Sequence, residues 1–124
     1  MHPVAYLWRR KFQEKKISLS PSRGARLNNL LRLSRSWRKI LGMTGLRPGH
    51  SVLEAGCGQG SQLIPLAVRG FRVTGVDSSP EALKEGERFI RELKKAGNPP
   101  RKIDLIAADF FDLELKRKYD LVFQ

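Results

Sequence analysis

The stretch Val52-Leu53-Glu54-Ala55-Gly56-Cys57-Gly58-Gln59-Gly60 decides the fold. Two apolar residues lead into a carboxylate, and three glycines then follow at alternate positions. A strand that ends in such a turn lets the backbone pass close to a ligand, because glycine has no Cβ and tolerates positive φ. Helix-forming residues follow from Gln62, so N–H groups at a helix N-terminus face the same place. The stretch therefore predicts a nucleotide-type cradle on an α/β fold.

The spacing of the glycines distinguishes two kinds of nucleotide site. A dinucleotide fingerprint reads G-x-G-x-x-G, but the position of its third glycine is Ser61, and this chain has G-x-G-x-G with Glu54 just ahead. A carboxylate there repels the pyrophosphate of NAD. It suits a ligand with positive charge, such as the ammonium and sulfonium of S-adenosylmethionine. A nicotinamide oxidoreductase is the alternative enzyme class, which Ser61 and Glu54 disfavour.

A second β-rich segment, residues 71–76, ends in Asp77, 21 residues after Gly56. An acid about 20 residues past the glycines is where dinucleotide folds bind a ribose diol, because a carboxylate accepts strong hydrogen bonds from both hydroxyls. The alternative is a turn or a helix cap, since residues 78–81 also look like a helix start. The distance from the glycines favours ribose binding.

Two further segments complete the pattern. Residues 103–108 are a candidate strand that leads into Asp109 and Phe110, and residues 119–124 (Tyr-Asp-Leu-Val-Phe-Gln) are a candidate fourth strand. In this order, the four motifs resemble those of the class I (Rossmann-like) S-adenosylmethionine-dependent methyltransferases. The resemblance covers about residues 28 to 124.

The resemblance implies roles for particular side chains. Glu54 would lie near the methionine ammonium of S-adenosylmethionine, and Asp77 would hold the ribose. Asp109 would accept a hydrogen bond from the adenine amino group, with Phe110 packed on the adenine face. The alternative makes Asp109 a turn or cap residue and places Phe110 and Phe111 in the core. The full candidate cofactor set is Glu54, Ala55, Gly56, Cys57, Gly58, Gly60, Asp77, Ser78, Ala108, Asp109 and Phe110.

The expected fold class is α/β. Strand–helix alternation with short loops predicts a parallel sheet with right-handed crossovers. We expect strands over 51–55, 71–76, 103–107 and 119–124, and helices over 60–69 and 80–96. The resemblance implies the first four strands of a seven-stranded Rossmann-like methyltransferase sheet, whose order is 3-2-1-4-5-7-6. Two N-terminal helices, over 3–17 and 22–41, are expected to precede this incomplete sheet.

Residues 1–49 are expected to be a basic helical extension, and residues 50–124 the cofactor-binding half of a methyltransferase domain, truncated at strand four. In the family, the residues that contact the methyl acceptor lie mostly beyond that strand, so the sequence assigns no catalytic residue. We expect the chain to be the N-terminal part of a longer protein and to be inactive alone. An unpaired edge at Leu121, Val122 and Phe123 predicts self-association.

Positive charge is concentrated at the N-terminal end. The formal net charge is +12, and residues 1–50 hold 12 Lys and Arg against one acid, Glu14. A helix face with Arg32, Arg35, Arg38 and Lys39 would bind phosphates in a salt-dependent way. The alternatives are a methyltransferase acting on RNA or another polyanion, or a non-catalytic nucleotide- or nucleic-acid-binding fragment. The favoured interpretation is a lid over the cofactor with a solvated basic face, and a small-molecule methyl acceptor.

Composition excludes several classes. No run of about 18 apolar residues could span a membrane, and the N-terminal charges come too early for a signal peptide. One cysteine and two histidines argue against a structural zinc site. The single cysteine also forms no internal disulfide, which fits the cytoplasm. We interpret Cys57 as a small side chain in a crowded turn, since no paired base for a nucleophile is apparent.

Overall fold

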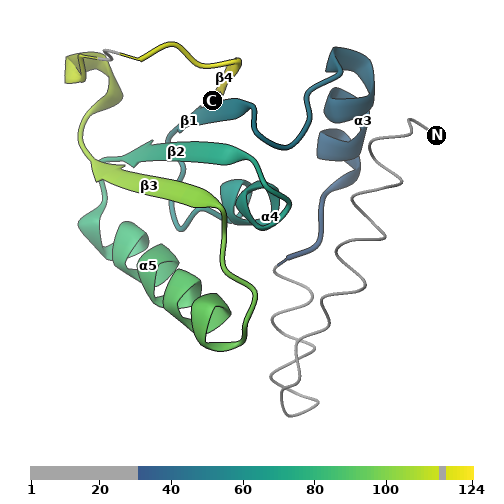
Figure 1. Ribbon diagram of the computed structural model, residues 1–124. Coiled ribbons are helices and arrows are strands. Elements are labelled where there is room, and N and C mark those ends of the chain that lie inside the picture. Colours follow the sequence, from purple (N-terminus) through teal and green to yellow (C-terminus); the bar gives the residue numbers. More distant parts are fainter. Residues whose placement is uncertain (1–30, 115–116) are drawn as a thin grey trace.

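The computed structural model describes residues 31–114 and 117–124. The expected helix over 3–17 and the first part of the one over 22–41 lie outside these residues. Four parallel strands form one sheet in the order β3-β2-β1-β4 (Figure 1). The strands are β1 (Ser51–Ala55), β2 (Arg72–Asp77), β3 (Lys102–Ala107) and β4 (Leu121–Phe123). This order confirms the predicted incomplete Rossmann-like sheet.

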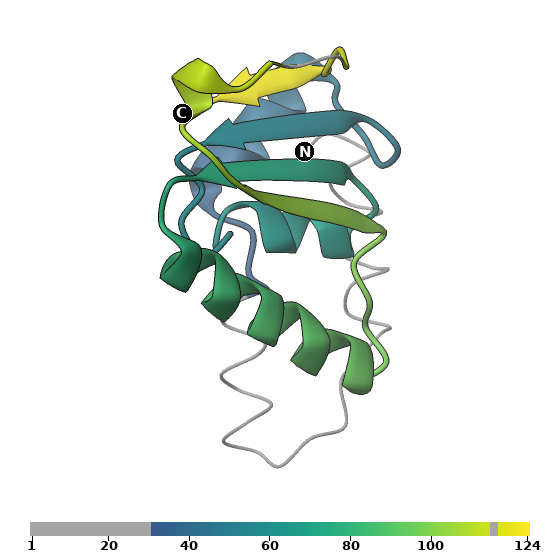
Figure 2. The same cartoon turned by 90° about the vertical axis from the view of Figure 1, so that its left-hand side faces the viewer.

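Three helices pack on one face of this sheet: α3 (Arg35–Thr44), α4 (Leu63–Val68) and α5 (Pro80–Lys95). Figure 2 shows α4 and α5 on the same side of the strands. The side chains of Val52 and Val73 on this face join the core cluster with α4, and Ile103 packs with α5 residues. On the opposite face, the Tyr119 hydroxyl lies 3.3 Å from Thr74 Oγ1.

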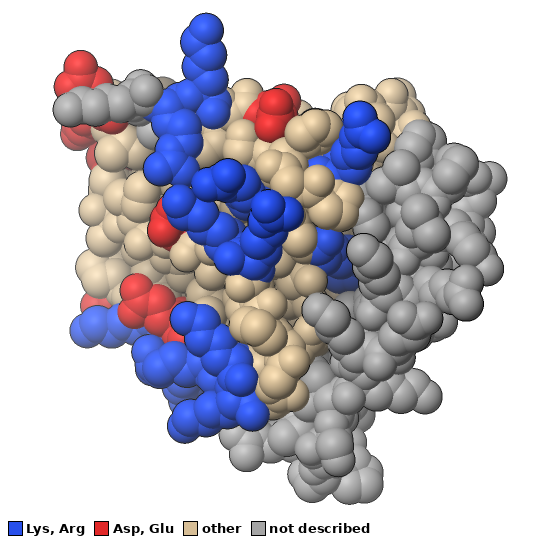
Figure 3. All heavy atoms as spheres, in the orientation of Figure 1, with Lys and Arg blue, Asp and Glu red and all other residues tan. Residues whose placement is uncertain are grey.

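Helix α5 has the amphipathic pattern that its sequence predicts. Its buried positions include Leu83, Ile90 and Leu93. The exposed basic residues are Lys84, Arg88, Arg91, Lys94 and Lys95. Figure 3 shows Lys and Arg gathered over α5 and the neighbouring region of β3.

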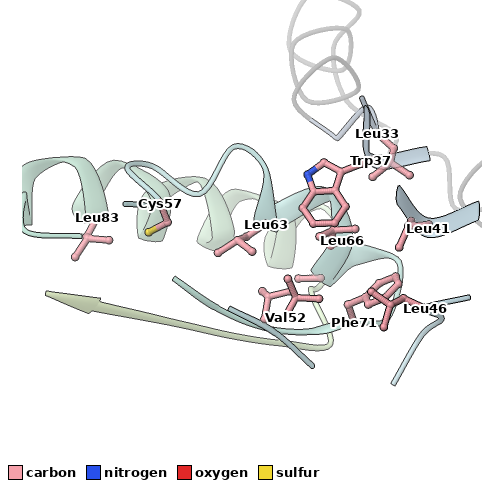
Figure 4. Packing of buried hydrophobic residues seen from close by; sticks show 12 residues of the cluster. Leu33, Trp37, Leu41, Leu46, Val52, Cys57, Leu63, Leu66, Phe71 and Leu83 are labelled. Carbon is pink, nitrogen blue, oxygen red and sulfur yellow. The ribbon is translucent and has the colours of Figure 1, made fainter. Parts of the chain in front are cut away.

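The main core cluster joins the helices to the sheet. In Figure 4, Trp37 of α3 lies close to Leu66 of α4. The Trp37 ring also meets Phe123 of β4 edge to face, with ring centroids 4.8 Å apart. Phe71, just before β2, is fully buried in the same cluster. Helix α3 is therefore anchored to α4 and to the sheet. No helix in the described ranges has the length and apolarity to cross a membrane.

The described part of the second N-terminal helix differs from the expected range of 22–41. Residues 31–34 are not helical, and α3 begins at Arg35 because the Ser34 side chain accepts a hydrogen bond from Trp37 N, as an N-cap. Gly42 does not end the helix. Gly45 does, with φ 72° and its N–H bonded to the Leu41 carbonyl.

Two other elements are shorter than predicted. Helix α4 is shorter than the expected 60–69, since Gly60 has φ 82° and the helix begins only at Leu63. Strand β4 covers three residues rather than six. After β3, a short 3-10 helix, η1 (Phe110–Asp112), forms in the connection toward β4.

Candidate functional site

An open pocket of about 220 Å³ lies where β1, β2 and β3 end. In open parallel sheets, ligands bind at these carboxyl ends. Its lining consists of Ala55, Gly56, Val76, Asp77, Ser78, Ala108, Asp109, Phe110, Phe111 and Gln124. Seven of these ten belong to the candidate set that the sequence predicts. Motifs far apart in the chain therefore meet around one cavity.

The glycine-rich loop after β1 is held against the end of β2. The N–H groups of Gly56 and Cys57 donate to the Val76 carbonyl at 2.7 and 3.1 Å. Gly56, Gly58 and Gly60 have φ values of 75°, 57° and 82°, a region that side chains disfavour. Gly56 lines the pocket, whereas Gly58 and Gly60 do not. The positive φ values of Gly58 and Gly60 favour glycine at both positions, whether or not a ligand contacts them.

Asp77 links this loop to the pocket. Its Oδ2 accepts from Gly58 N and its Oδ1 accepts from Ser79 N, both at 2.8 Å. Each carboxylate oxygen has two lone pairs, so each keeps one for a ligand. The N-cap of α5 is Ser79, whose hydroxyl accepts from Ala82 N at 3.3 Å. The alternative that Asp77 caps this helix is therefore wrong, although Asp77 does shape the turn before it.

Glu54 is a buried carboxylate that lacks a donor. The residue is 8% exposed, and Oε1 has no hydrogen-bond partner among the described residues. Such a group is costly to bury. Burial, and then the nearby charge of Asp77, raise the pKa of Glu54 to about 7. Glu54 does not line the pocket, although the next residue, Ala55, does. The negative charge of Asp77 near Glu54 favours a cationic donor.

Cys57 is a packed thiol rather than an activated one. It is buried, and its Sγ donates to the Gly58 carbonyl at 3.6 Å. Burial and the charge of Glu54 raise the pKa of the Cys57 thiol to about 11. The thiolate is the nucleophilic form, so Cys57 is not a nucleophile at neutral pH.

Asp109 and two aromatic residues form the far side of the pocket. Asp109 Oδ1 accepts from Phe111 N at 3.0 Å, and its carboxylate is exposed. The rings of Phe110 and Phe111 meet edge to face, with centroids 6.2 Å apart. Phe111 is 88% exposed. The alternative that it belongs to the core is wrong, because the 3-10 turn directs it outward.

Sequence reasoning missed several residues of this region. Val76, Phe111 and Gln124 line the pocket without having been predicted. Of these three, only Phe111 could have been predicted from the sequence, because it is an aromatic residue next to Phe110. Two glycines inside regular elements, Gly75 and Gly86, were also missed, although such glycines usually have a packing reason. A Cβ at Gly75 would lie 2.6 Å from Cys57 Sγ.

Helix α3 does not contribute to the pocket. No α3 residue contributes to the lining. The expected lid over the cofactor therefore finds no support in α3, because its apolar face is used against α4 and the sheet.

Comparisons with known proteins agree with this geometry. The sequence model of a family described as "Methyltransferase domain" matches residues 52–124. An S-adenosyl-L-methionine-dependent Diels-Alderase of Talaromyces variabilis is 38% identical over 82 residues, which cover 66% of this chain and 27% of that protein. The magnesium-protoporphyrin O-methyltransferase of Synechocystis sp. is 43% identical over 56 residues, 45% of this chain and 24% of that protein. This chain thus spans about a quarter of the length of either relative.

Solved structures give the same result. The magnesium protoporphyrin IX methyltransferase from Synechocystis PCC 6803 with bound SAM matches with a TM-score of 0.54 at 32% identity, over 79% of this chain and 41% of that one. Coclaurine N-methyltransferase matches with a TM-score of 0.57 over 86% of this chain and 28% of that one, at 23% identity. At that identity, the second match concerns the fold alone.

Proposed function

Because the chain belongs to the methyltransferase-domain family, whose sequence model it matches over residues 52–124, we propose that it is the S-adenosylmethionine-binding part of a methyltransferase. The observation that carries the proposal is the grouping of Asp77 and Asp109 around one pocket. Glu54, next to the lining residue Ala55, adds a buried Oε1 without a hydrogen-bond partner among the described residues. S-adenosylmethionine presents three kinds of donor: an ammonium, a ribose diol and an adenine amino group. Three carboxylates are the matching set of acceptors.

Each side chain then has one task. Asp77 accepts from the ribose hydroxyls with the lone pairs that Gly58 N and Ser79 N leave unused. Glu54 neutralises the positive charge of the methionine ammonium, directly or through water. Asp109 accepts from the adenine amino group, and Phe110 packs on the ring. Gly56 allows close approach of the backbone at the pocket wall.

Bound S-adenosylmethionine supplies a methyl group activated by the sulfonium, which an acceptor O, N, S or C attacks in line. The protein therefore contributes mainly binding and orientation. The residues of this chain hold the cofactor, and no catalytic residue is assigned among them. We propose a small-molecule acceptor, because the methyltransferase relative is named for magnesium-protoporphyrin.

A second candidate is use of the same cofactor without methyl transfer. The specific observation is the 38% identity to a protein named as an S-adenosyl-L-methionine-dependent Diels-Alderase. Cofactor binding is common to both candidates. They differ in whether S-adenosylhomocysteine accumulates when the whole protein acts on its substrate.

Isothermal titration calorimetry with S-adenosylmethionine, S-adenosylhomocysteine and NAD tests the proposal. We expect the first two to bind and NAD to bind more weakly, because a carboxylate at Glu54 opposes the pyrophosphate. Tighter binding of NAD would refute the proposal and favour an oxidoreductase.

RNA, or another polyanion, is the alternative macromolecular partner. Arg32, Arg35, Arg38 and Lys39 are all exposed. If they contact phosphates, RNA binding will fall steeply with salt, and changing the four to Gln will reduce the slope of log K against log salt. If the chain binds no RNA at low salt, the RNA alternative is excluded and the small-molecule proposal remains.

A further inference from the structure

Gly86 occupies an unusual place for a glycine. It is buried in the interior of α5, a 16-residue helix with a Ser79 cap and a regular apolar face. Glycine weakens a helix interior relative to alanine. Its φ is not positive, so the backbone conformation does not require glycine. A contact with a neighbouring segment must therefore leave no room for a side chain at this position.

That contact is the glycine-rich loop. A Cβ at position 86 would lie 2.4 Å from the Gln59 carbonyl oxygen and 3.1 Å from Leu105 Cδ1. A contact under 3.0 Å forces a shift, and a backbone carbonyl cannot rotate away as a side chain can. Either α5 or the loop must then move.

The loop transmits such a shift to the pocket. Gln59 directly follows Gly58, whose N–H donates to Asp77 Oδ2 at 2.8 Å. The loop also cannot move toward the sheet, because Cys57 already fills the space that a Cβ at Gly75 would occupy. Displacement of the Gln59 carbonyl therefore strains the Gly58–Asp77 hydrogen bond.

We propose that Gly86 is a positioning residue for the cofactor site. It sets how closely α5 approaches residues 56–60, and thereby the orientation of the Asp77 carboxylate. Gly86 does not line the pocket, so it acts only through Gln59 and Gly58. The proposal rests on the proposed function, since it assigns Gly86 to the same cofactor site.

The test compares Gly86→Ala with Gly42→Ala in the whole 124-residue chain. Gly42 is the matched control: it lies inside helix α3, is exposed, and has nothing within 4 Å of a built Cβ. Both variants gain helix propensity, but only one meets the loop. The probe is S-adenosylhomocysteine, titrated by calorimetry at a temperature where circular dichroism shows each variant folded.

We expect Gly86→Ala to weaken S-adenosylhomocysteine binding at least tenfold, and Gly42→Ala to leave it unchanged. Amide hydrogen exchange supplies a second readout: Gly58 N–H should exchange faster in Gly86→Ala, while the β2–β3 amides stay protected. A purely structural role would accelerate exchange throughout without lowering the affinity of the folded protein. Unchanged affinity and unchanged Gly58 exchange would overturn the proposal.

Two further outcomes are also decisive. If the unchanged chain binds no S-adenosylhomocysteine, the proposed function fails, whereas the Gly58 exchange rates still test the contact. If Gly86→Ala does not fold at 25 °C, it is measured at 4 °C with trimethylamine N-oxide, which favours compact states. A variant unfolded even there contradicts the proposal, because the clash should displace a loop and leave the fold intact.

Discussion

At the scale of single residues, Glu54 makes folding stability depend on pH. Its pKa is raised from 4.5 to about 7 in the folded protein. A carboxyl with a raised pKa binds its proton more tightly when folded, so its contribution is complete below about pH 4.5 and is lost as pH rises through 7. We expect a loss of about 3 kcal/mol over this range, at about 1.4 kcal/mol per pKa unit. Urea unfolding at several pH values measures it.

The control is Glu54→Gln, which keeps the shape and removes the titration. The difference in unfolding free energy between the two proteins should change between pH 4.5 and 7 and be flat above it. Parallel pH profiles would mean that Glu54 does not titrate in this range. Since the ligand ammonium favours the ionised form, S-adenosylmethionine affinity should rise over the same pH range only in the unchanged chain.

Asp77 is the residue whose loss should cost the most affinity. Asp77→Ala removes an ionised acceptor from the pocket, and hydrogen bonds to charged groups contribute about 1.5–3 kcal/mol. We expect S-adenosylmethionine binding to weaken by that amount in calorimetry. Ser79→Ala is the control, because it removes the α5 cap, at a typical cost of about 1 kcal/mol of stability, without touching the lining. If Asp77→Ala binds S-adenosylmethionine with unchanged affinity, Asp77 has only a structural role in the turn before α5.

The sequence predicted the residues whose roles follow from local spacing. Asp77 was placed by its distance from the glycines and Asp109 by the resemblance to the methyltransferase family, and both line the pocket. Gly86 was not found, because its role depends on a contact with Gln59, on another element. The 3-10 turn that exposes Phe111 is capped by the Asp109 side chain, as the alternative interpretation of Asp109 proposed.

At the scale of elements, β4 is held by a clamp at its start. Asp120 Oδ2 accepts from Ser51 N at 2.8 Å and from Ser51 Oγ at 3.2 Å. In return, Asp120 N donates to the Ser51 carbonyl at 3.0 Å. The hydrogen bond from Ser51 N holds the pKa of Asp120 below its usual value. A strand of three residues makes few ladder bonds, so this clamp helps to fix its register.

Asp120→Ala should therefore loosen β4 selectively. We expect faster amide exchange at residues 121–123, with little change in β2 and β3, because those strands pair with each other independently of β4. Acid should act in the same direction, since a lowered pKa stabilises the fold above the usual Asp pKa and loses that effect as the carboxylate protonates. Equal exchange in the two proteins would show that Phe123 and Trp37 alone hold the strand.

The bounds of β1, β2, β3 and α5 were predicted better than those of α3, α4 and β4. The bounds of β1 agree with prediction, and those of β2 and β3 differ by one residue, because Gly and Pro delimit these apolar runs. The start of α3 was wrong, because the helical spacing of Leu27 and Leu30 with Trp37 predicted one helix through residues 31–34, where the backbone is not helical. Capping by Ser34, rather than periodicity, sets that boundary.

At the scale of the whole molecule, β4 has an open edge. Among the described strands it pairs with β1 alone. Val122 is 52% exposed, whereas Leu121 and Phe123 are partly buried and pack on the core cluster. The predicted apolar edge is thus smaller than expected, because alternate side chains point toward α3. The unpaired backbone still offers a template for another strand.

We expect the 124-residue chain to self-associate at micromolar concentration and to bind S-adenosylmethionine without transferring its methyl group. Size-exclusion chromatography with light scattering measures the first, and a methyl-transfer assay over broad acceptor pools measures the second. Val122→Lys should reduce association, since a charge on an edge strand opposes pairing. A stable monomer that turns over substrate would contradict both expectations.

Apart from Gln124, every residue that lines the pocket lies between Ala55 and Phe111. Nine of the ten lining residues thus come from one uninterrupted stretch, from the end of β1 to the 3-10 turn. A recombination event in the connection between that turn and β4 would keep these nine residues together and replace β4 and Gln124. Such exchange offers a simple route by which one ancestral gene segment could serve enzymes with unrelated chemistries. The connection between the 3-10 turn and β4 is therefore a suitable position at which to join segments of two proteins in a chimaera.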